Sequence, residues 1–218
     1  MIATMSIVGG VTGSTVVTWA YGQQDGRMAK DMRILLVGAP GSGKGTQAVE
    51  IARRFGLTHI SSGDLLRKHV ADGTATGRAV RDYLKRGDLV PDAIVADILY
   101  KPVTAAVARG GYVLDGYPRT VEQAEAAYEV AGEKGTNVQL ALHLDVPTKE
   151  LVRRLLARGR GSDDTEDVIA HRLEVYQEKT VPLLEYYAKR ETLVQVNGAR
   201  PVGEVAWSIA VQLQRIKL

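Results

Sequence analysis

A glycine-rich loop between a predicted strand and a predicted helix constrains the fold more than any other feature. Residues 33–37, RILLV, form a continuous apolar run that is typical of a buried parallel strand. The loop GAPGSGKGT follows at 38–46, and apolar residues then recur at helical spacing up to Phe55. Glycine backbone N–H groups can surround an anion, and the start of a helix adds positive potential. The stretch predicts a phosphate-binding loop; the alternative is a glycine-rich turn without a ligand.

The loop departs from the usual phosphate-loop pattern at one position. In that pattern the lysine is followed at once by Ser or Thr, whose hydroxyl binds Mg²⁺. Here Lys44 is followed by Gly45, and the hydroxyl comes one place later, at Thr46. We expect Lys44 to reach the terminal phosphates and Thr46 to contact phosphate. A metal ion would then need other groups to hold it.

The remainder of the chain alternates strand and helix patterns. Four further strands are predicted at 57–60, 111–115, 138–146 and 192–196. Five strands interleaved with helices predict an α/β fold with a parallel sheet and helices on both faces. Pro102 falls inside a predicted helix that opens at Pro91, so we expect a kink or a break there.

Composition limits the classes of function. The 218 residues suit one sizeable domain. The chain has no cysteine, which excludes disulfides, thiolate zinc sites and cysteine nucleophiles. A net charge of +3 is compatible with nucleic-acid binding or with a cleft for small phosphorylated ligands. The placement of the arginines must decide between the two.

Residues 1–31 differ from the rest of the chain. They are rich in Gly, Thr and Val, lack a basic start, and contain only a short, interrupted apolar run. That pattern argues against a signal peptide and against a membrane span. We interpret the segment as a disordered extension, a mis-assigned start or an added leader, with Met28 and Met32 as alternative starts. The expected protein is cytoplasmic and does not contact a membrane.

Asp115 ends the predicted strand 111–115 and opens the stretch DGYPRT. Ligands of open α/β sheets bind at the carboxyl ends of the strands. An acid at such an end, beside a phosphate loop, can hold Mg²⁺ through water. Structural use of Asp115 is the alternative interpretation. Arg119 follows in a turn that Pro118 sets.

Arginines crowd one helix and the loop after it. Arg154 and Arg158 are four residues apart and share a helix face, and Arg160 and Arg172 follow. Their forked donors match phosphate oxygens, as phosphoryl transfer requires. A solvated basic face is the alternative. Asp163 and Asp164 can pair with these arginines when no ligand is bound, and capping of the next helix is favoured over a metal site for DDTED.

These motifs together resemble the adenylate kinase family in its short-lid bacterial form. The resemblance runs from Met32 to the C-terminus through GAPGSGKGTQ, ISSGDLLR, GDLVPD, LDGYPRTVEQA, RRLLARGR, DDTEDVIAHR and VNGARPV. It implies the P-loop nucleoside monophosphate kinase fold, with a helical AMP-binding segment at about 61–90 and a lid at about 157–165. It also implies the substrates ATP, AMP and ADP, Mg²⁺ as cofactor, no lid zinc, no nucleic acid, and a monomer.

The resemblance also implies site residues. For ATP they are Gly41, Ser42, Gly43, Lys44, Gly45, Thr46, Arg154, Arg158 and Arg200. For AMP they are Ser62, Arg67, Asp88, Leu89, Val90, Gly116, Tyr117, Pro118, Arg119, Gln123, Arg160 and Arg172. The catalytic set is Lys44, Arg119, Arg158, Arg160 and Arg172, with Asp115 on water-bound Mg²⁺. Family spacing fits Arg160 less well, because the lid loop is one residue longer than expected.

Two alternatives stay open at this point. A kinase for UMP, CMP or another nucleoside monophosphate would share the DGYPR motif, although Gln123 and Ser62 favour adenine. A nucleotide-binding regulator that kept the fold and lost catalysis belongs to a different class. Formation of ADP from ATP and AMP separates the enzyme from the regulator.

Overall fold

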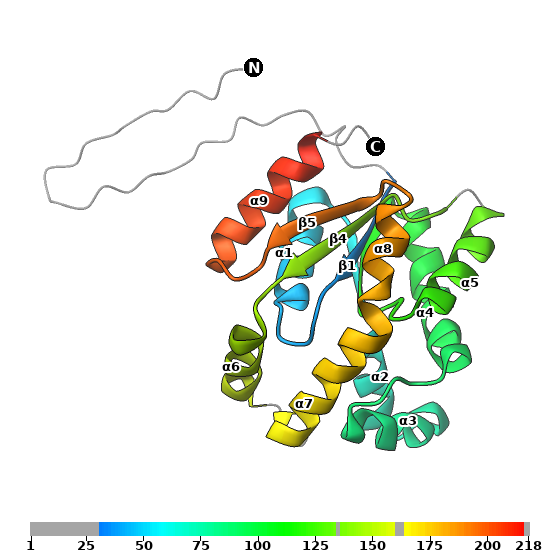
Figure 1. The fold of residues 1–218 in the computed structure, drawn as a ribbon. Coiled ribbons are helices and arrows are strands. Elements are labelled where there is room, and N and C mark those ends of the chain that lie inside the picture. The colour runs from blue at the N-terminus through cyan, green and yellow to red at the C-terminus, as the bar shows by residue number, and fades with distance from the viewer. Residues whose placement is uncertain (1–30, 134–135, 160–163, 216–218) are drawn as a thin grey trace, which may run out of the picture.

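The computed structural model describes residues 31–133, 136–159 and 164–215. Five parallel strands form one sheet in the order β2-β3-β1-β4-β5 (Figure 1). Their bounds are β1 Met32–Val37, β2 Thr58–Ser61, β3 Gly111–Asp115, β4 Leu140–Asp145 and β5 Leu193–Asn197. The predicted extension at 1–31 lies outside the described residues except for Asp31. The α/β fold with a five-stranded parallel sheet is confirmed.

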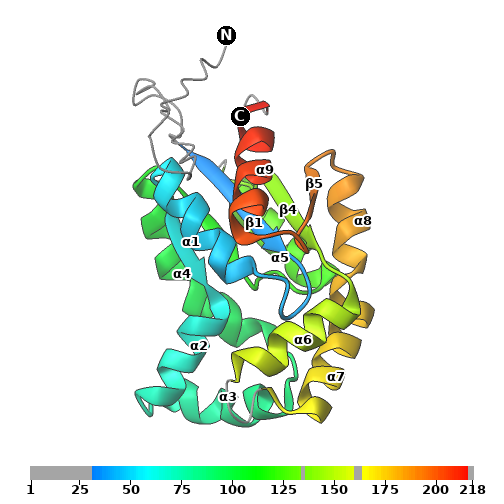
Figure 2. The same cartoon turned by 90° about the vertical axis from the view of Figure 1, so that its left-hand side faces the viewer.

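Helices connect the strands and also extend from one end of the sheet. In the first half of the chain they are α1 Lys44–Phe55, α2 Ser62–Ala71, α3 Ala75–Arg86 and α4 Asp92–Ala108. The second half contains α5 Val121–Gly132, α6 Thr148–Arg158, α7 Glu166–Val175, α8 Pro182–Ala188 and α9 Val202–Arg215. A π-helical turn, η2 (Tyr176–Thr180), joins α7 to α8. In both views α2, α3, α6 and α7 lie beyond the same end of the sheet (Figures 1 and 2).

Two apolar cores cover the two faces of the sheet, because alternate residues of a strand point to opposite faces. Ile34 and Leu36 of β1 pack in a core with residues of α1 and α9. Leu35 and Val37 pack in the other core, with residues of α2, α4, α5 and α8. Burial on both faces explains why β1 reads as a continuous apolar run.

The carboxyl end of the central strand β1 leads into the phosphate-binding loop. β1 pairs with β3 so that Leu36 lies opposite Asp115, and with β4 so that Val37 lies opposite His143. β3 also pairs with β2, where Ser61 lies opposite Asp115. The sheet therefore brings Asp115 and the glycine-rich loop to one edge, as the sequence predicts.

Of the two outcomes predicted at Pro102, a kink or a break, the break does not occur. Helix α4 runs without interruption from Asp92 to Ala108. Pro102 removes one backbone donor, but the helix buries Val95, Leu99 and Ala106 on both sides of it. That packing holds the helix together across the missing hydrogen bond.

Candidate active site

A cleft of about 920 Å³ opens at the carboxyl edge of the sheet. Its walls come from the phosphate loop, the end of β3, the first turn of α2, helices α6 and α7, and the loop after β5. These segments are far apart in the sequence. The crossover topology of the parallel sheet brings them together at its carboxyl edge.

Glycines of the phosphate loop adopt backbone conformations that other residues rarely take. Gly41 has a φ of 83° and Gly43, which precedes α1, has a φ of 94°. A Cβ atom at Gly41 would lie 2.9 Å from the carbonyl oxygen of Leu151 and from Cγ of Leu155. Gly41 is therefore required both by its φ and by the close approach of α6.

Lys44 begins α1 and its ammonium group turns back into the loop. Its Nζ donates hydrogen bonds to the carbonyl oxygens of Gly38 at 2.7 Å and Ala39 at 2.9 Å. Burial lowers the pKa of Lys44 to about 8, although the charge of Asp115 opposes that shift. The charges of nearby arginines contribute to this lowered pKa of about 8. A phosphate group bound in the cleft would place a further negative charge beside the Lys44 ammonium group.

Asp115 lies beside Gly45 at the start of α1. A Cβ atom at position 45 would be 3.6 Å from Oδ2 of Asp115. The carboxylate thus borders the position from which a Ser side chain would project in the usual phosphate loop. Among the described residues no group of three or more His, Cys, Asp or Glu side chains could hold a metal ion. One carboxylate next to the loop fits a Mg²⁺ ion that keeps its waters and binds nucleotide phosphates.

Arg119 is half-buried and borders both the cleft and a smaller pocket. Its Nε donates to the carbonyl oxygen of Gly116 at 2.9 Å, and its own carbonyl oxygen accepts from Thr180 Oγ1 at 2.8 Å. Burial lowers the pKa of Arg119, while Asp115 partly counteracts the shift. Thr180 was not predicted; it comes from η2, 61 residues along the chain.

Asp164 pairs with arginines from two helices. Arg158 at the end of α6 donates to both carboxylate oxygens, at 2.9 Å from Nε and 2.5 Å from Nη2. Arg172 of α7 has its Nη1 3.7 Å from Oδ1 of Asp164. Only 1% of the Asp164 side chain is exposed. The arginines predicted to grip the transferring phosphate are therefore paired with a carboxylate in this structure, as the sequence predicts for Asp164.

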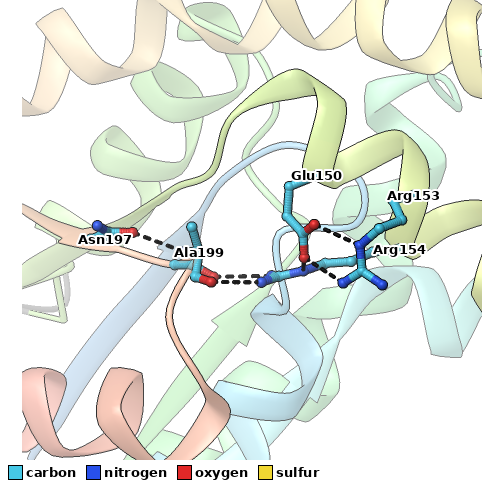
Figure 3. A network of polar contacts seen from close by, with 6 residues as sticks. Glu150, Arg153, Arg154, Asn197 and Ala199 are labelled. Carbon is cyan, nitrogen blue, oxygen red and sulfur yellow. Dashed lines mark hydrogen bonds and ion pairs between the residues drawn. The ribbon is translucent and has the colours of Figure 1, made fainter.

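Arg154, which lines the cleft, belongs to a second arginine network that connects α6 with the loop after β5 (Figure 3). Its Nε donates to Glu150 at 2.7 Å, and its terminal nitrogens donate to the carbonyl oxygens of Gly198 at 3.0 Å and Ala199 at 3.3 Å. Arg153 pairs with the same carboxylate (Figure 3). Hydrogen bonds from the two arginines lower the pKa of Glu150 to about 2. Arg154 thus ties α6 to the loop that carries Arg200, and Glu150, which was not predicted, holds the Arg154 guanidinium from within the same helix.

A smaller pocket adjoins the cleft under the predicted AMP-binding segment. Ser62, Leu89, Val90 and Gln123 are among the residues that line it. Oγ of Ser62 is buried and has no hydrogen-bond partner among the described residues. The amide of Gln123 accepts from the N–H of Arg119 at 2.7 Å and donates through Nε2 to Asp92 at 2.6 Å. The Ser62 hydroxyl is therefore a polar atom at this pocket that is open to a further hydrogen bond.

Asp88 has its carboxylate turned away from this pocket toward α7. Nε2 of His171 lies 2.8 Å from its Oδ1, and Arg86 donates to Oδ2 at 2.7 Å. Hydrogen bonding to His171, and then to Arg86, lowers the pKa of Asp88. At the neighbouring Gly87 a Cβ atom would lie 2.5 Å from Cγ of Arg172. This close packing joins α7 to the segment at 61–90.

All predicted site residues that the structure describes line one of the two pockets. Those on the large cleft are Gly41, Ser42, Gly43, Lys44, Gly45, Thr46, Arg67, Asp115, Pro118, Arg154, Arg158, Arg172 and Arg200. Those on the small pocket are Ser62, Asp88, Val90, Tyr117 and Gln123, while Leu89, Gly116 and Arg119 border both. Arg160 and part of the predicted lid at 157–165 lie outside the described residues.

The two pockets share Leu89, Gly116 and Arg119 as lining residues. With a phosphate loop at the carboxyl edge of a five-stranded parallel sheet and arginines from several elements lining one cleft, the fold and site define a nucleoside monophosphate kinase of the P-loop class. A family model described as adenylate kinase matches residues 36–192. The chain belongs to the adenylate kinase family, and its enzyme class is phosphotransferase.

Individual relatives agree with the family model. An adenylate kinase of Methanothrix thermoacetophila is 39% identical over 215 residues, which cover 85% of this chain and 100% of the relative. An adenylate kinase of Mycobacteroides abscessus is 44% identical over 174 residues, covering 80% and 94%. Adenylate kinase 1 of Synechocystis sp. is 42% identical over 182 residues, covering 84% and 97%.

Proposed function

We propose that the protein catalyses the reversible transfer of a phosphoryl group from ATP to AMP, giving two ADP. The observation that carries the choice of AMP is the small pocket with an amide, Gln123, and a buried, unpartnered hydroxyl, Ser62. An amide and a small hydroxyl can pair with the hydrogen-bonding edge of adenine. ATP takes the phosphate loop, with its base between Arg154 and the carbonyl of Arg200.

Direct in-line transfer is the proposed mechanism. A phosphate oxygen of AMP, already anionic, attacks the γ-phosphorus of ATP; that new P–O bond forms as the bond to the β–γ bridging oxygen breaks. No general base is required. Lys44 follows the transferring group from the phosphate loop, while Arg119, Arg158 and Arg172 neutralise charge on its oxygens. Positioning by these fixed donors supplies most of the rate.

Mg²⁺ bound to ATP would neutralise part of the phosphate charge. Asp115, beside Gly45, would orient waters of the ion instead of binding it directly. Thr46 would contact phosphate. This division of labour accounts for the glycine that follows Lys44, where most phosphate loops carry a hydroxyl.

The pairing of Arg158 and Arg172 with Asp164 belongs to the state without nucleotide. Phosphate oxygens would compete with the carboxylate for the same guanidinium donors. Transfer of the arginines from Asp164 to phosphate would accompany lid closure over 157–165, with Arg160 joining the clamp. Closure excludes water, which otherwise hydrolyses ATP.

We further propose that the protein works as a cytoplasmic monomer that maintains adenine nucleotide balance, without nucleic-acid or membrane partners. No helix among the described residues has the length and apolar character needed to cross a membrane. The arginines of the large cleft converge on a pocket sized for a nucleotide, which favours a small phosphorylated ligand over nucleic acid.

Comparison of acceptors tests the proposal. Steady-state rates with Mg-ATP and AMP, CMP, UMP or GMP should give the highest kcat/KM for AMP. Faster use of CMP or UMP would assign the protein to another nucleoside monophosphate kinase. Tight nucleotide binding with no diphosphate formed from any acceptor would instead indicate a regulator that lost catalysis.

A further inference from the structure

The amide of Gln123 is held in one orientation by two partners with opposite chemistry. The backbone N–H of Arg119 can only donate, and it lies 2.7 Å from Oε1. The Asp92 carboxylate accepts from Nε2 at 2.6 Å. If the amide were reversed, its Nε2–H groups would face the backbone N–H of Arg119, and its Oε1 would face the carboxylate of Asp92. The two neighbours therefore decide which end of the amide is the donor.

We propose that Asp92 is a positioning residue that makes the acceptor pocket select 6-aminopurines over 6-oxopurines. Gln123 is only 3% exposed and lines the small pocket. After its bonds to Arg119 and Asp92, its amide retains one N–H and one oxygen lone pair for a ligand there. The proposal rests on the proposed function, in which AMP binds in this pocket.

The chemistry of the two base types explains the selection. Adenine presents an acceptor at N1 beside an amino donor at position 6. These two groups match the remaining N–H and the remaining oxygen lone pair of the Gln123 amide. Hypoxanthine, the base of IMP, presents the reverse: a donor at N1 and an acceptor at O6. IMP would therefore require the reversed amide. Rejection follows because reversal breaks two hydrogen bonds and leaves buried polar atoms unpaired.

Asp92 supplies the stronger part of this restraint. It is the first residue of α4, whereas Gln123 lies in the first turn of α5, 31 residues further along the chain. A hydrogen bond to a carboxylate is stronger than one between neutral groups. Without Asp92, only the N–H of Arg119 would oppose reversal of the amide.

The test compares kcat/KM for AMP and for IMP, with Mg-ATP as donor, in the full-length protein. Asp92→Ala should lower the AMP/IMP ratio by roughly tenfold or more, the size of one lost charge-assisted hydrogen bond. Asp92→Asn can accept through Oδ1 or donate through Nδ2 after rotation of its own amide, so it no longer fixes the orientation of Gln123 and should also lower the ratio. Asp97→Ala, which changes an exposed acid on the same helix, serves as the matched control and should leave the ratio unchanged.

Several outcomes would overturn the proposal. If Asp92→Ala slows AMP and IMP equally, Asp92 only supports the fold. If Asp92→Asn keeps the wild-type ratio, the acceptor-only character of Asp92 is not what orients the amide, and the proposal fails. Should Asp92→Ala fail to fold by circular dichroism, Asp92→Ser, whose shorter side chain ends away from Gln123, takes its place with the same expectation. Wild-type protein that forms no ADP from AMP refutes the proposed function as well, whereas an active wild type with an unchanged variant ratio refutes this inference alone.

Discussion

Lys44 is a cation in a place where water solvates it poorly. Its ammonium group is bound by two backbone carbonyl oxygens, and the nearest opposing charge is Asp115, which only partly offsets the loss of hydration. Its pKa of about 8 means that a large fraction of the side chain is neutral in mildly alkaline solution. Nucleotide phosphates would stabilise the charged form and return the pKa toward its ordinary value.

Proton uptake on nucleotide binding follows from this shift. At pH 8.5, above the pKa of about 8, Lys44 is mostly neutral before binding and becomes protonated as its pKa rises. Titration calorimetry with ATP in buffers of different ionisation enthalpy should show a fraction of a proton taken up per site. Lys44→Met should abolish this uptake, and Lys149→Met, at an exposed position of α6, should not. Equal uptake in wild type and Lys44→Met would contradict the assignment.

Asp115 and Gly45 together predict how the enzyme depends on metal. With the carboxylate acting through water, Asp115→Asn should raise the Mg²⁺ concentration for half-maximal rate by about tenfold, the effect expected for a group outside the direct ligand shell. EDTA should abolish turnover in both proteins. A bound-state structure with Thr46 Oγ directly on the metal, or an unchanged Mg²⁺ requirement in Asp115→Asn, would show that the division of labour is different.

The carboxylate of Asp164 joins helices α6 and α7 through Arg158 and Arg172. Asp164→Ala leaves Arg158 and Arg172 without that partner, so we expect the free energy of unfolding to fall by about 1–3 kcal/mol. The difference between variant and wild type should shrink when Mg-ATP and AMP are present, because phosphate oxygens replace the carboxylate. Chemical denaturation with and without nucleotides measures both quantities.

The matched control for this helix pair is Asp167→Ala, an exposed acid in the first turn of α7. It should change stability by no more than the loss of a favourable helix-end charge, roughly 0.3–1 kcal/mol, with no dependence on nucleotide. A deficit in Asp164→Ala that stays the same with and without nucleotide would argue that the arginines do not leave Asp164 on binding.

The element pattern was predictable where the signal is local. The alternating strand and helix pattern identified all five strands, with ends shifted by no more than two residues. Helix α8, which opens at Pro182, was missed, because η2 joins it to α7 without a loop. Pro102 shows the converse error: tertiary packing overrides a local signal for a break.

Partners of the site residues were much less predictable than the residues themselves. Motif spacing is enough to nominate Lys44 and Gln123, because each belongs to a short contiguous pattern. Thr180 belongs to no such pattern, and Asp92, although it ends the GDLVPD motif, was not expected to contact Gln123. The contacts join residues 61 and 31 positions apart. Contacts of that kind depend on how η2 and α4 pack against the rest of the molecule. The local spacing of residue types in one sequence does not reveal that packing.

The whole molecule depends on two cores divided by the sheet. Ile34 is fully buried at the centre of one core, beneath α1 and α9. Ile34→Ala should reduce the free energy of unfolding by about 2–5 kcal/mol, the usual cost of such a cavity. Activity per folded molecule should persist, because Ile34 lies inside the sheet and does not line the cleft. Denaturant titration and active-site-normalised kcat measure the two quantities, and a loss below 1 kcal/mol would contradict the packing described.

Quantification of ADP formed from ATP, Mg²⁺ and AMP tests the account most directly, with wild type and Lys44→Met assayed side by side. Wild type should form two ADP for each AMP consumed. Lys44→Met should be slower by orders of magnitude while its circular dichroism spectrum stays that of the folded protein. Near-normal turnover in folded Lys44→Met, or nucleotide binding by wild type without any ADP, would contradict phosphoryl transfer in this cleft.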